Sequence, residues 1–496
     1  MTQRYSPLIV AFGLLVGLSN AASVRADLAA DVQAVLKDKV LGRAEMGVQI
    51  VRLGEAPEAD QVLFRHNAAA PLIPASNLKL VSTAAAIDAL GQDFKFRTLL
   101  LKHNDDLVLI GDGDPTLGDT DLLRKSGWNA TTLFKNWAEQ LKKHGITDFA
   151  RLVVDDSVFD EQYVHPNWPT DQLHKRYVAG VAGLNLNVNC MDFYIRVTEP
   201  GEVVNYVAEP ATGYVDITNT CVTGGDNAIW LSRYPGGNNI VLKGRTPYST
   251  DVAVSVTIHD PTMFTGHVLR ETFAAGGIKF ASAVPVRDRT LRAALLKTPL
   301  DQDPSWRVLA IHETPLATVL ARANKDSVNV YAEALCKRIG AAATNQPGSW
   351  ANGTAANGAY LAKIGVAAAE YKFDDGCGLS KENLISANAL SHLLSHNWHH
   401  KGTRDAFFTS LSVAGKDGTL EGRFQGTDLA GRVFGKSGFV NGVRTLSGYV
   451  KARDGHWYAF SILFNNLADT ATGRNLQEAI VRSVDANSRE MAASGR

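Results

Sequence analysis

The sequence has no excess of charge of either sign. Its 496 residues include 50 lysines and arginines against 50 aspartates and glutamates, so the formal net charge is +0. Proteins that bind nucleic acid or membrane surfaces carry a basic excess or a basic patch, so this balance supports neither class. The composition, 45% apolar and 20% charged, is typical of a globular chain, and the length suits two or three domains.

Long apolar runs are also missing, apart from a short one near the N-terminus. Residues 8–18 form that run, Arg4 precedes it, and small residues lead to Val24-Arg25-Ala26. This is the pattern of a signal peptide, and the run is too short to span a bilayer. We therefore predict a signal peptide over residues 1–26, a periplasmic location and no transmembrane segment, with a peripheral membrane association left open.

Cysteine is scarce as well. The four cysteines are Cys190, Cys221, Cys336 and Cys377, and none stands at metal-ligand spacing, so they predict no metal site. An exported protein can form disulfides. Pairing Cys190 with Cys221 and Cys336 with Cys377 is one of three possible pairings, and the sequence does not choose among them.

A serine and a lysine stand at the start of an alanine-rich helix. Apolar residues recur at three- and four-residue steps from Leu80 to Leu90, which predicts a buried helix that begins at Ser76. Lys79 lies three residues after Ser76 and therefore on the same face. A lysine amine can activate a serine hydroxyl when burial lowers the pKa of the amine. On its own this spacing more often means a solvated serine and a surface lysine, so the prediction of acyl transfer depends on partner motifs.

The first partner motif is Ser-x-Asn, which supplies a second hydroxyl and an amide for the substrate. The chain has three such triplets: Ser327-Val328-Asn329, Ser386-Ala387-Asn388 and Ser395-His396-Asn397. The second begins a predicted helix, where serine is a common cap, and the third lies inside a His-rich helix. The first lies on a turn between two predicted helices, so Ser327 and Asn329 are the candidates.

The second partner motif is Lys-Ser/Thr-Gly, whose cation binds the substrate carboxylate. Lys125-Ser126-Gly127 lies in a polar stretch, whereas Lys436-Ser437-Gly438 lies on a predicted strand that a second strand follows. The edge of a sheet can bind an extended peptide, and glycine allows close backbone approach. We therefore select Lys436, Ser437 and Gly438. Residues 430–437 also nearly match a phosphate-binding loop, but the helix that such a loop requires does not follow.

The predicted elements place these motifs along the chain. Helices are expected at residues 27–40, 76–90, 131–144, 261–275, 316–324, 330–339, 354–370, 386–401 and 475–484. Strands are expected at 46–52, 62–64, 96–101, 107–110, 150–154, 252–258, 308–312, 432–436, 444–451 and 456–465.

With these motifs in place, the chain resembles the penicillin-binding D-alanyl-D-alanine carboxypeptidase/endopeptidase family, the low-molecular-mass class C group. The resemblance covers nearly all of the mature chain. Two residues depart from the family pattern: Ser437, where Thr is usual, and Cys377, where Ser is common. The change at Ser437 keeps the hydroxyl. Besides the three motifs, the similar segments are residues 111–117, 259–261, 375–380 and 414–420.

The resemblance implies an α/β (α+β) fold, a serine β-lactamase/transpeptidase-like domain with a large strand-rich insertion. The catalytic domain would comprise residues 27–90 and 300–496, and the insertion residues 91–299. Such an insertion separates the chain from class A β-lactamases, in which the first two motifs lie much closer together.

The resemblance also implies a role for each site residue. Ser76 would attack the carbonyl of the penultimate D-Ala of a peptidoglycan stem peptide, and Lys79 would take its proton. Ser327 would relay a proton to the leaving amine, and Asn329 would hold the substrate amide. Lys436 and Ser437 would bind the terminal carboxylate, and Gly438 would allow close backbone approach. The N–H groups of Ser76 and Phe439 would stabilise the oxyanion. Asp155 would contact the diamino acid of the substrate, or would only end its strand.

The implied function is a serine D-Ala-D-Ala carboxypeptidase/endopeptidase that needs no metal or cofactor. Its partners would be peptidoglycan peptides and β-lactams, the latter as acylating inhibitors. Two alternatives stay open: a β-lactamase-like hydrolase of the same fold, and a non-catalytic scaffold that binds the cell wall. The sequence predicts neither the balance between the two peptidase activities nor the oligomeric state.

Overall fold

The protein forms two compact units. The computed structural model describes residues 28–298 and 302–493, so the predicted signal peptide at residues 1–26 lies outside the described residues. Among the described residues, unit 1 comprises residues 28–84, Asn324–Ser327 and residues 357–493, and unit 2 comprises residues 85–298, residues 302–323 and Val328–Ala356. The predicted boundaries of the inserted domain, after residue 90 and after residue 299, are not tested by this division and stay a prediction.

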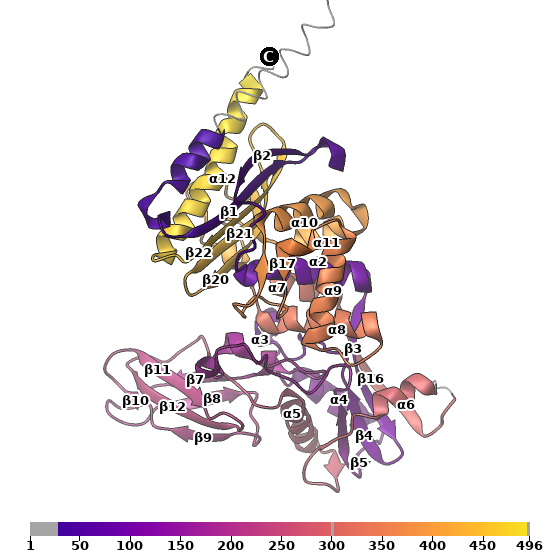
Figure 1. Ribbon diagram of the computed structural model, residues 1–496. Helices are drawn as coiled ribbons and strands as arrows, with labels where there is room; N and C mark the ends of the chain where they lie inside the picture. The colour runs from indigo at the N-terminus through magenta and orange to yellow at the C-terminus, as the bar shows by residue number, and fades with distance from the viewer. Residues whose placement is uncertain (1–27, 299–301, 494–496) are drawn as a thin grey trace, which may run out of the picture. The chain divides into compact units, whose positions relative to one another are not determined.

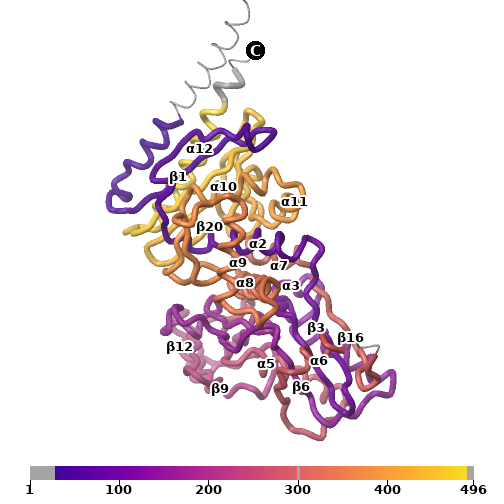
Figure 2. Tube along the Cα trace, turned by 45° about the vertical axis from the view of Figure 1, so that its right-hand side comes forward, coloured from indigo at the N-terminus to yellow at the C-terminus, as the bar shows by residue number. Residues whose placement is uncertain are grey.

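Unit 1 is built on a six-stranded antiparallel sheet in the order β19-β20-β21-β22-β1-β2. The sheet joins the two ends of the described chain, because β1 pairs with β22 along its whole length, from Glu45–Asn465 to Arg52–Tyr458. Figure 2 shows the indigo N-terminal strand beside the yellow C-terminal strands. The strands are β1 (Glu45–Arg52), β2 (Gln61–His66), β19 (Ser412–Val413), β20 (Val433–Val440), β21 (Val443–Lys451) and β22 (Trp457–Asn465).

Both faces of this sheet are covered by helices. Successive side chains of a strand point to opposite faces, so the neighbours Val48 and Gln49 of β1 mark one face each. On one face, Val48 and Phe460 pack in a core with Ile480 of α12 (Thr470–Ala493) and with a helix at residues 28–36. On the other face, Gln49 donates to Ser391 of α10 (Ala387–His399). Figure 1 shows α12 and α10 on either side of the sheet.

Unit 2 contains a mixed five-stranded sheet in the order β15-β6-β4-β3-β16. Helices α4 (Thr132–Lys143) and α5 (Pro261–Ala275) supply Phe134, Trp137 and Phe273 to its main core. A four-stranded and a three-stranded sheet complete the strand-rich part. The five-stranded sheet consists of β3 (Lys95–His103), β4 (Asp106–Ile110), β6 (Leu152–Asp155), β15 (Val286–Arg287) and β16 (Trp306–Pro315).

The remaining strands form the four-stranded sheet, the three-stranded sheet and two two-stranded sheets, β14-β5 and β17-β18. The other strands are β5 (Asp148–Phe149), β7 (Cys190–Arg196), β8 (Asn205–Glu209), β9 (Asp216–Asn219), β10 (Val222–Thr223), β11 (Ala228–Arg233), β12 (Asn239–Thr246), β13 (Val254–Thr257), β14 (Lys279–Phe280), β17 (Tyr371–Lys372) and β18 (Leu384–Ile385). The other helices are α2 (Lys79–Leu90), α3 (Thr120–Leu123), α6 (Leu291–Lys297), α7 (Leu316–Asn324), α8 (Asn329–Thr344), α9 (Trp350–Lys363) and α11 (Lys401–Ser410).

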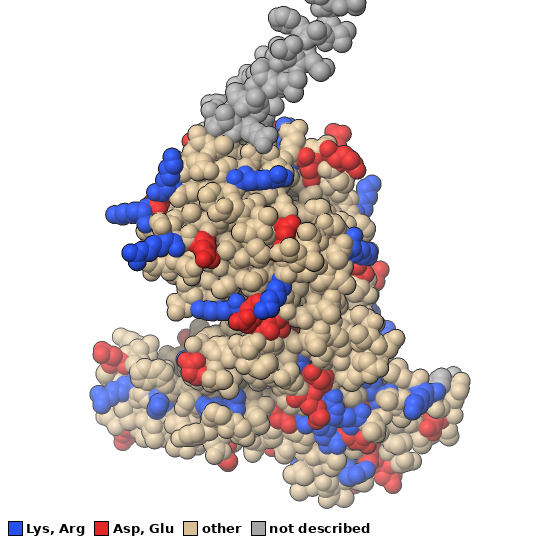
Figure 3. All heavy atoms as spheres, in the orientation of Figure 1, with Lys and Arg blue, Asp and Glu red and all other residues tan. Residues whose placement is uncertain are grey.

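Three features bear on the predictions about export and partners. All four cysteines are buried and none forms a disulfide, so neither bond of the pairing considered above is present. No helix among the described residues has both the length and the apolarity needed to cross a membrane. Basic and acidic side chains are interspersed over the face drawn in Figure 3.

Candidate active site

The candidate nucleophile lies on a single turn of 3-10 helix, η3 (Ala75–Leu78), that leads directly into α2. Ala75 adopts a left-handed backbone conformation, with φ of 46°, which is uncommon for a residue with a side chain. The turn leaves Ser76 half-buried and the following Lys79 fully buried. The Lys79 Nζ lies 3.0 Å from the Ser76 Oγ. The structure therefore brings the predicted nucleophile and its predicted base into hydrogen-bond contact.

A second contact orients the Lys79 amine, which also donates to the carbonyl oxygen of Cys377 at 3.0 Å. A carbonyl oxygen can only accept, so this contact uses one N–H of the amine. A neutral amine keeps its lone pair, which can then face the Ser76 hydroxyl. No motif in the sequence pointed to this carbonyl, although residues 375–380, one of the segments that resemble the family, contain it.

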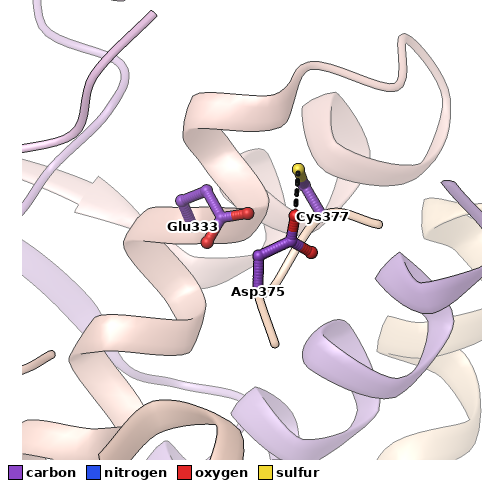
Figure 4. A group of neighbouring side chains, drawn as sticks. All are labelled: Glu333, Asp375 and Cys377. Carbon is purple, nitrogen blue, oxygen red and sulfur yellow. Dashed lines mark hydrogen bonds between the residues drawn. The ribbon is translucent and has the colours of Figure 1, made fainter. Parts of the chain in front are cut away.

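The Cys377 carbonyl is held by a tight turn around Asp375. The Asp375 carboxylate accepts from the backbone N–H groups of Gly378 and Ser380, both at 2.7 Å. Figure 4 shows the same carboxylate beside the Cys377 thiol, whose Sγ lies 3.9 Å from Asp375 Oδ2. Gly378 has φ of 84°, and a Cβ there would lie 1.8 Å from the Ala75 carbonyl oxygen. The turn therefore packs directly against the nucleophile turn.

Ser327 lies on the turn between α7 and α8, as predicted. It adopts a left-handed conformation with φ of 61°. A non-glycine residue held in this region costs free energy and persists where its surroundings fix it, often at functional sites. The Ser327 Oγ accepts a hydrogen bond of 2.8 Å from the Lys436 Nζ.

Lys436 lies on β20, and its side chain is fully buried. Its Nζ donates to the Ser327 Oγ and, at 2.7 Å, to the Ser437 carbonyl oxygen. Burial lowers the pKa of Lys436 well below its usual value; the charge of Lys79 lowers it further, and Asp326 acts in the opposite direction. The two predicted lysines are thus close enough to repel each other.

Gly438 lets β20 approach the nucleophile turn. A Cβ at residue 438 would lie 2.1 Å from Thr445 Oγ1, 2.9 Å from the Ser76 nitrogen and 3.0 Å from the Pro74 carbonyl oxygen. Thr445 also donates to that Pro74 oxygen at 2.7 Å. Only glycine fits at this position. The β20 backbone therefore closely approaches the turn that carries Ser76, as the glycine in the motif predicted.

The edge of β20 beside this turn is open. The short strand β19 pairs with β20 at Phe434 and Gly435 alone, and no other described strand pairs with this edge from Lys436 to Val440. Ser437 is half-buried, and its Oγ donates to Thr419 Oγ1 at 2.9 Å. The Phe439 side chain is 54% exposed, with the Arg444 guanidinium 4.0 Å from the centre of its ring.

Two predicted site residues belong to unit 2. Asn329 is the first residue of α8, and its Nδ2 donates to the Tyr177 carbonyl oxygen at 2.7 Å. Asp155 is fully buried at the end of β6, and its two carboxylate oxygens accept from the backbone N–H groups of Ser157 and Arg292, each at 2.7 Å. These bonds are those of a structural carboxylate, so we do not carry Asp155 into the proposed mechanism.

The rejected motifs occupy ordinary structural positions. Ser386 caps α10, where its side chain accepts from the Ala389 N–H at 2.8 Å. Lys125 and Ser126 form a 3-10 turn that Gly127 ends. Residues 433–440 form β20, and the strand β21 follows them rather than the helix of a phosphate-binding loop.

Known protein families and proteins are similar to this chain over most of its length. The model of the D-Ala-D-Ala carboxypeptidase 3 (S13) family matches residues 28–487. A D-alanyl-D-alanine carboxypeptidase of Actinomadura sp. (strain R39) is 30% identical over 475 residues, which cover 90% of this chain and 83% of the relative. The carboxypeptidase DacB of Haemophilus influenzae is 27% identical over 422 residues, with 82% and 83% covered.

A solved structure has the same fold. The crystal structure of penicillin binding protein 4 (dacB) from Haemophilus influenzae superposes with a TM-score of 0.74 at 21% identity, over 92% of this chain and 99% of that one. The predicted fold, a transpeptidase-like domain with additional strand-rich sheets, is therefore confirmed.

Proposed function

The chain belongs to the D-Ala-D-Ala carboxypeptidase 3 (S13) family, and from this premise we propose that it releases the terminal D-Ala of peptidoglycan stem peptides through an acyl-Ser76 intermediate. The observation that carries the proposal is the 3.0 Å separation of the Lys79 Nζ and the Ser76 Oγ. Neutral Lys79 takes the Ser76 proton as the hydroxyl oxygen attacks the carbonyl carbon of the penultimate D-Ala.

Ser327 is the proton donor to the leaving group. Its oxygen accepts from Lys436, so the one hydrogen of the hydroxyl stays available. This hydrogen passes to the amine nitrogen of the departing D-Ala as the peptide bond breaks, and Ser327 takes a proton from Lys436 in its place. Water then attacks the acyl-enzyme. Its proton returns through Ser327 to Lys436, and Lys79 returns the first proton to the Ser76 oxygen as the ester bond breaks.

Substrate binding uses the open edge of β20, which can pair with an extended peptide. Lys436 and Ser437 bind the terminal carboxylate, and the N–H groups of Ser76 and Phe439 stabilise the oxyanion, at roughly 3 kcal/mol per donor. For Asn329, contact with the substrate amide stays a prediction from the Ser-x-Asn motif. β-Lactams present a reactive carbonyl beside a carboxylate and therefore acylate Ser76.

The proposal extends to cross-link cleavage and to a periplasmic location. In a cross-linked peptide the D-Ala carbonyl also forms an amide, with an amine of a second peptide. Ser76 would attack this carbonyl in the same way, and that amine would be the leaving group. The periplasmic location rests on the apolar run at residues 8–18 and on the peptidoglycan substrate.

The proposal is tested with purified wild-type protein and the Ser76→Ala variant, incubated with an acyl-D-Ala-D-Ala peptide, with purified muropeptides and with benzylpenicillin. We expect D-Ala release by the wild type, a loss of on the order of 10³-fold or more in the variant, and a long-lived penicillin adduct on Ser76 by mass spectrometry. Near-normal turnover by the variant would refute the assignment. Rapid penicillin hydrolysis without D-Ala release would favour a β-lactamase instead.

A further inference from the structure

Thr419 carries a hydroxyl at the open edge of β20 that the mechanism above does not use. It lies on a turn of 3-10 helix, η9 (Gly418–Leu420), and the residue is exposed. Its Oγ1 accepts a hydrogen bond of 2.9 Å from Ser437, one of the two residues proposed to bind the substrate carboxylate. Thr419 therefore lies immediately beside the carboxylate-binding position.

The position of Thr419 is fixed by the segment that carries Ser327. The Thr419 N–H donates to the Lys325 carbonyl oxygen at 2.8 Å, and Ser412 donates to the same oxygen at 3.0 Å. The Lys325 ammonium in turn forms an ion pair of 2.6 Å with Asp417. The loop that carries Thr419 is thus bonded both to the Ser327 turn and to β20, and both belong to unit 1.

Among the three neighbouring hydroxyls of Ser437, Ser412 and Thr419, the Thr419 hydrogen is the one that is not used in a short hydrogen bond. Ser437 donates its hydrogen to Thr419, and Ser412 donates its hydrogen to the Lys325 carbonyl. Thr419 Oγ1 lies 3.4 Å from Ser412 Oγ, beyond the usual range of an O–H···O hydrogen bond. The Thr419 hydrogen is therefore available to an acceptor that arrives with the substrate.

We infer that Thr419 binds one oxygen of the substrate's terminal carboxylate while Ser437 binds the other. The inference rests on the proposed function and adds a fourth chain segment to its site. Two hydroxyls 2.9 Å apart match the two oxygens of one carboxylate, and Lys436 supplies the positive charge. When the anion arrives, Ser437 turns its hydrogen from Thr419 to the carboxylate, and Thr419 donates its own.

The test compares substrates with and without the charge. Wild type, Thr419→Val and Thr419→Ser are assayed with an acyl-D-Ala-D-Ala peptide and with the same peptide ending in a carboxamide. Acylation of Ser76 by benzylpenicillin and by its methyl ester is measured by intact mass as a second pair. Thr409→Val is the matched control, because Thr409 is exposed and donates to the Asp405 carbonyl within its own helix.

We expect Thr419→Val to lower kcat/KM for the carboxylate peptide, and the acylation rate by the free acid, by tenfold or more. The carboxamide and the ester should stay within about twofold of wild type, and Thr419→Ser should restore the discrimination. Equal loss on charged and uncharged partners would mean a structural role, and no loss on either would mean no role. Both results overturn the inference and leave the proposed function intact, whereas a wild type that releases no D-Ala overturns both.

Discussion

At the scale of single residues, the candidate site contains two buried lysine amines that lie close enough to repel each other when both are charged. Lys79 and Lys436 are both fully buried, and their repulsion contributes to the low pKa of Lys436. Two adjacent ammonium groups out of water are unfavourable, so a state with one charge is preferred. In the free protein the lowered pKa favours loss of the Lys436 proton. The proposed mechanism needs the charge on Lys436 and a neutral Lys79, and an arriving substrate carboxylate favours that distribution because it stabilises a charged Lys436. The carboxylate of the substrate offsets the repulsion when Lys436 is charged.

The low pKa of Lys436 predicts how stability depends on pH. The unfolded chain keeps the Lys436 proton up to about pH 10.5, and the folded protein loses it at lower pH. Between these pKa values the unfolded state binds more protons, so this residue makes the free energy of unfolding rise with pH. We expect wild type to gain stability relative to Lys436→Met between pH 7 and pH 9.5, as measured by urea unfolding.

The control for this experiment is Lys401→Met, which removes an exposed lysine at the start of α11. Its difference from wild type should stay constant over the same pH range. Parallel pH profiles for wild type and Lys436→Met would contradict the prediction.

Gly438 gives a second prediction at this scale. A methyl group at residue 438 would overlap Thr445 Oγ1 and press on the Ser76 nitrogen, so Gly438→Ala should shift the nucleophile turn away from β20. A displacement of about 1 Å can cost on the order of 10²-fold in rate. We expect such a loss in acylation by benzylpenicillin, measured by stopped-flow or mass spectrometry. The control is Gly237→Ala, at a glycine with open space around it, which should be acylated at the wild-type rate. If Gly438→Ala is acylated as fast as this control, the close approach of β20 to the Ser76 turn is not needed for acylation.

At the scale of elements, sequence prediction succeeded where local signals were strong. Helices α5 and α7 have the predicted bounds because Asp260-Pro261 and Pro315 mark their starts. The predicted helix at residues 386–401 corresponds to α10, which ends at His399, and the helix α11 that begins at Lys401 was not predicted. The predicted helix at Ser76 begins instead as a 3-10 turn, because packing against β20 and the Asp375 turn holds Ala75 in a left-handed conformation that local propensity disfavours.

The two serines of competing Ser-x-Asn triplets give a prediction that separates a helix cap from a catalytic hydroxyl. Ser386→Ala removes the cap of α10 and should lower the free energy of unfolding by about 1 kcal/mol while kcat/KM stays within about twofold. Ser327→Ala removes an acceptor of the buried Lys436 amine, so it should lower the free energy of unfolding by about 1 kcal/mol or more. Unlike Ser386→Ala, it should also lower kcat by on the order of 10²-fold or more, because the leaving amine loses its proton donor. Thermal melts and D-Ala release measure both. The reverse pattern would exchange the roles of the two serines.

At the scale of the whole molecule, the candidate site depends on chain segments that are distant in sequence. Ser76 and Lys79, the turn with Ser327, and the strand with Lys436 all belong to unit 1 and contact one another there. Periodicity and turn residues could predict each segment, and the family resemblance predicted that they converge. Nothing local predicted the Cys377 carbonyl or the Thr419 hydroxyl, because their contacts exist only after distant strands and turns have packed.

The same dependence predicts the effect of removing the C-terminal helix. Helix α12 places Ile480, Val481 and Val484, all buried, on the sheet that carries Lys436. Burial of three such side chains contributes about 5 kcal/mol or more, comparable with the total stability of many domains. A chain that ends at Asp469 should therefore fail to bind fluorescent penicillin, although every proposed catalytic residue is present, whereas a chain that ends at Ala493 should label normally. Normal labelling of the shorter chain would show that the sheet holds the site without α12.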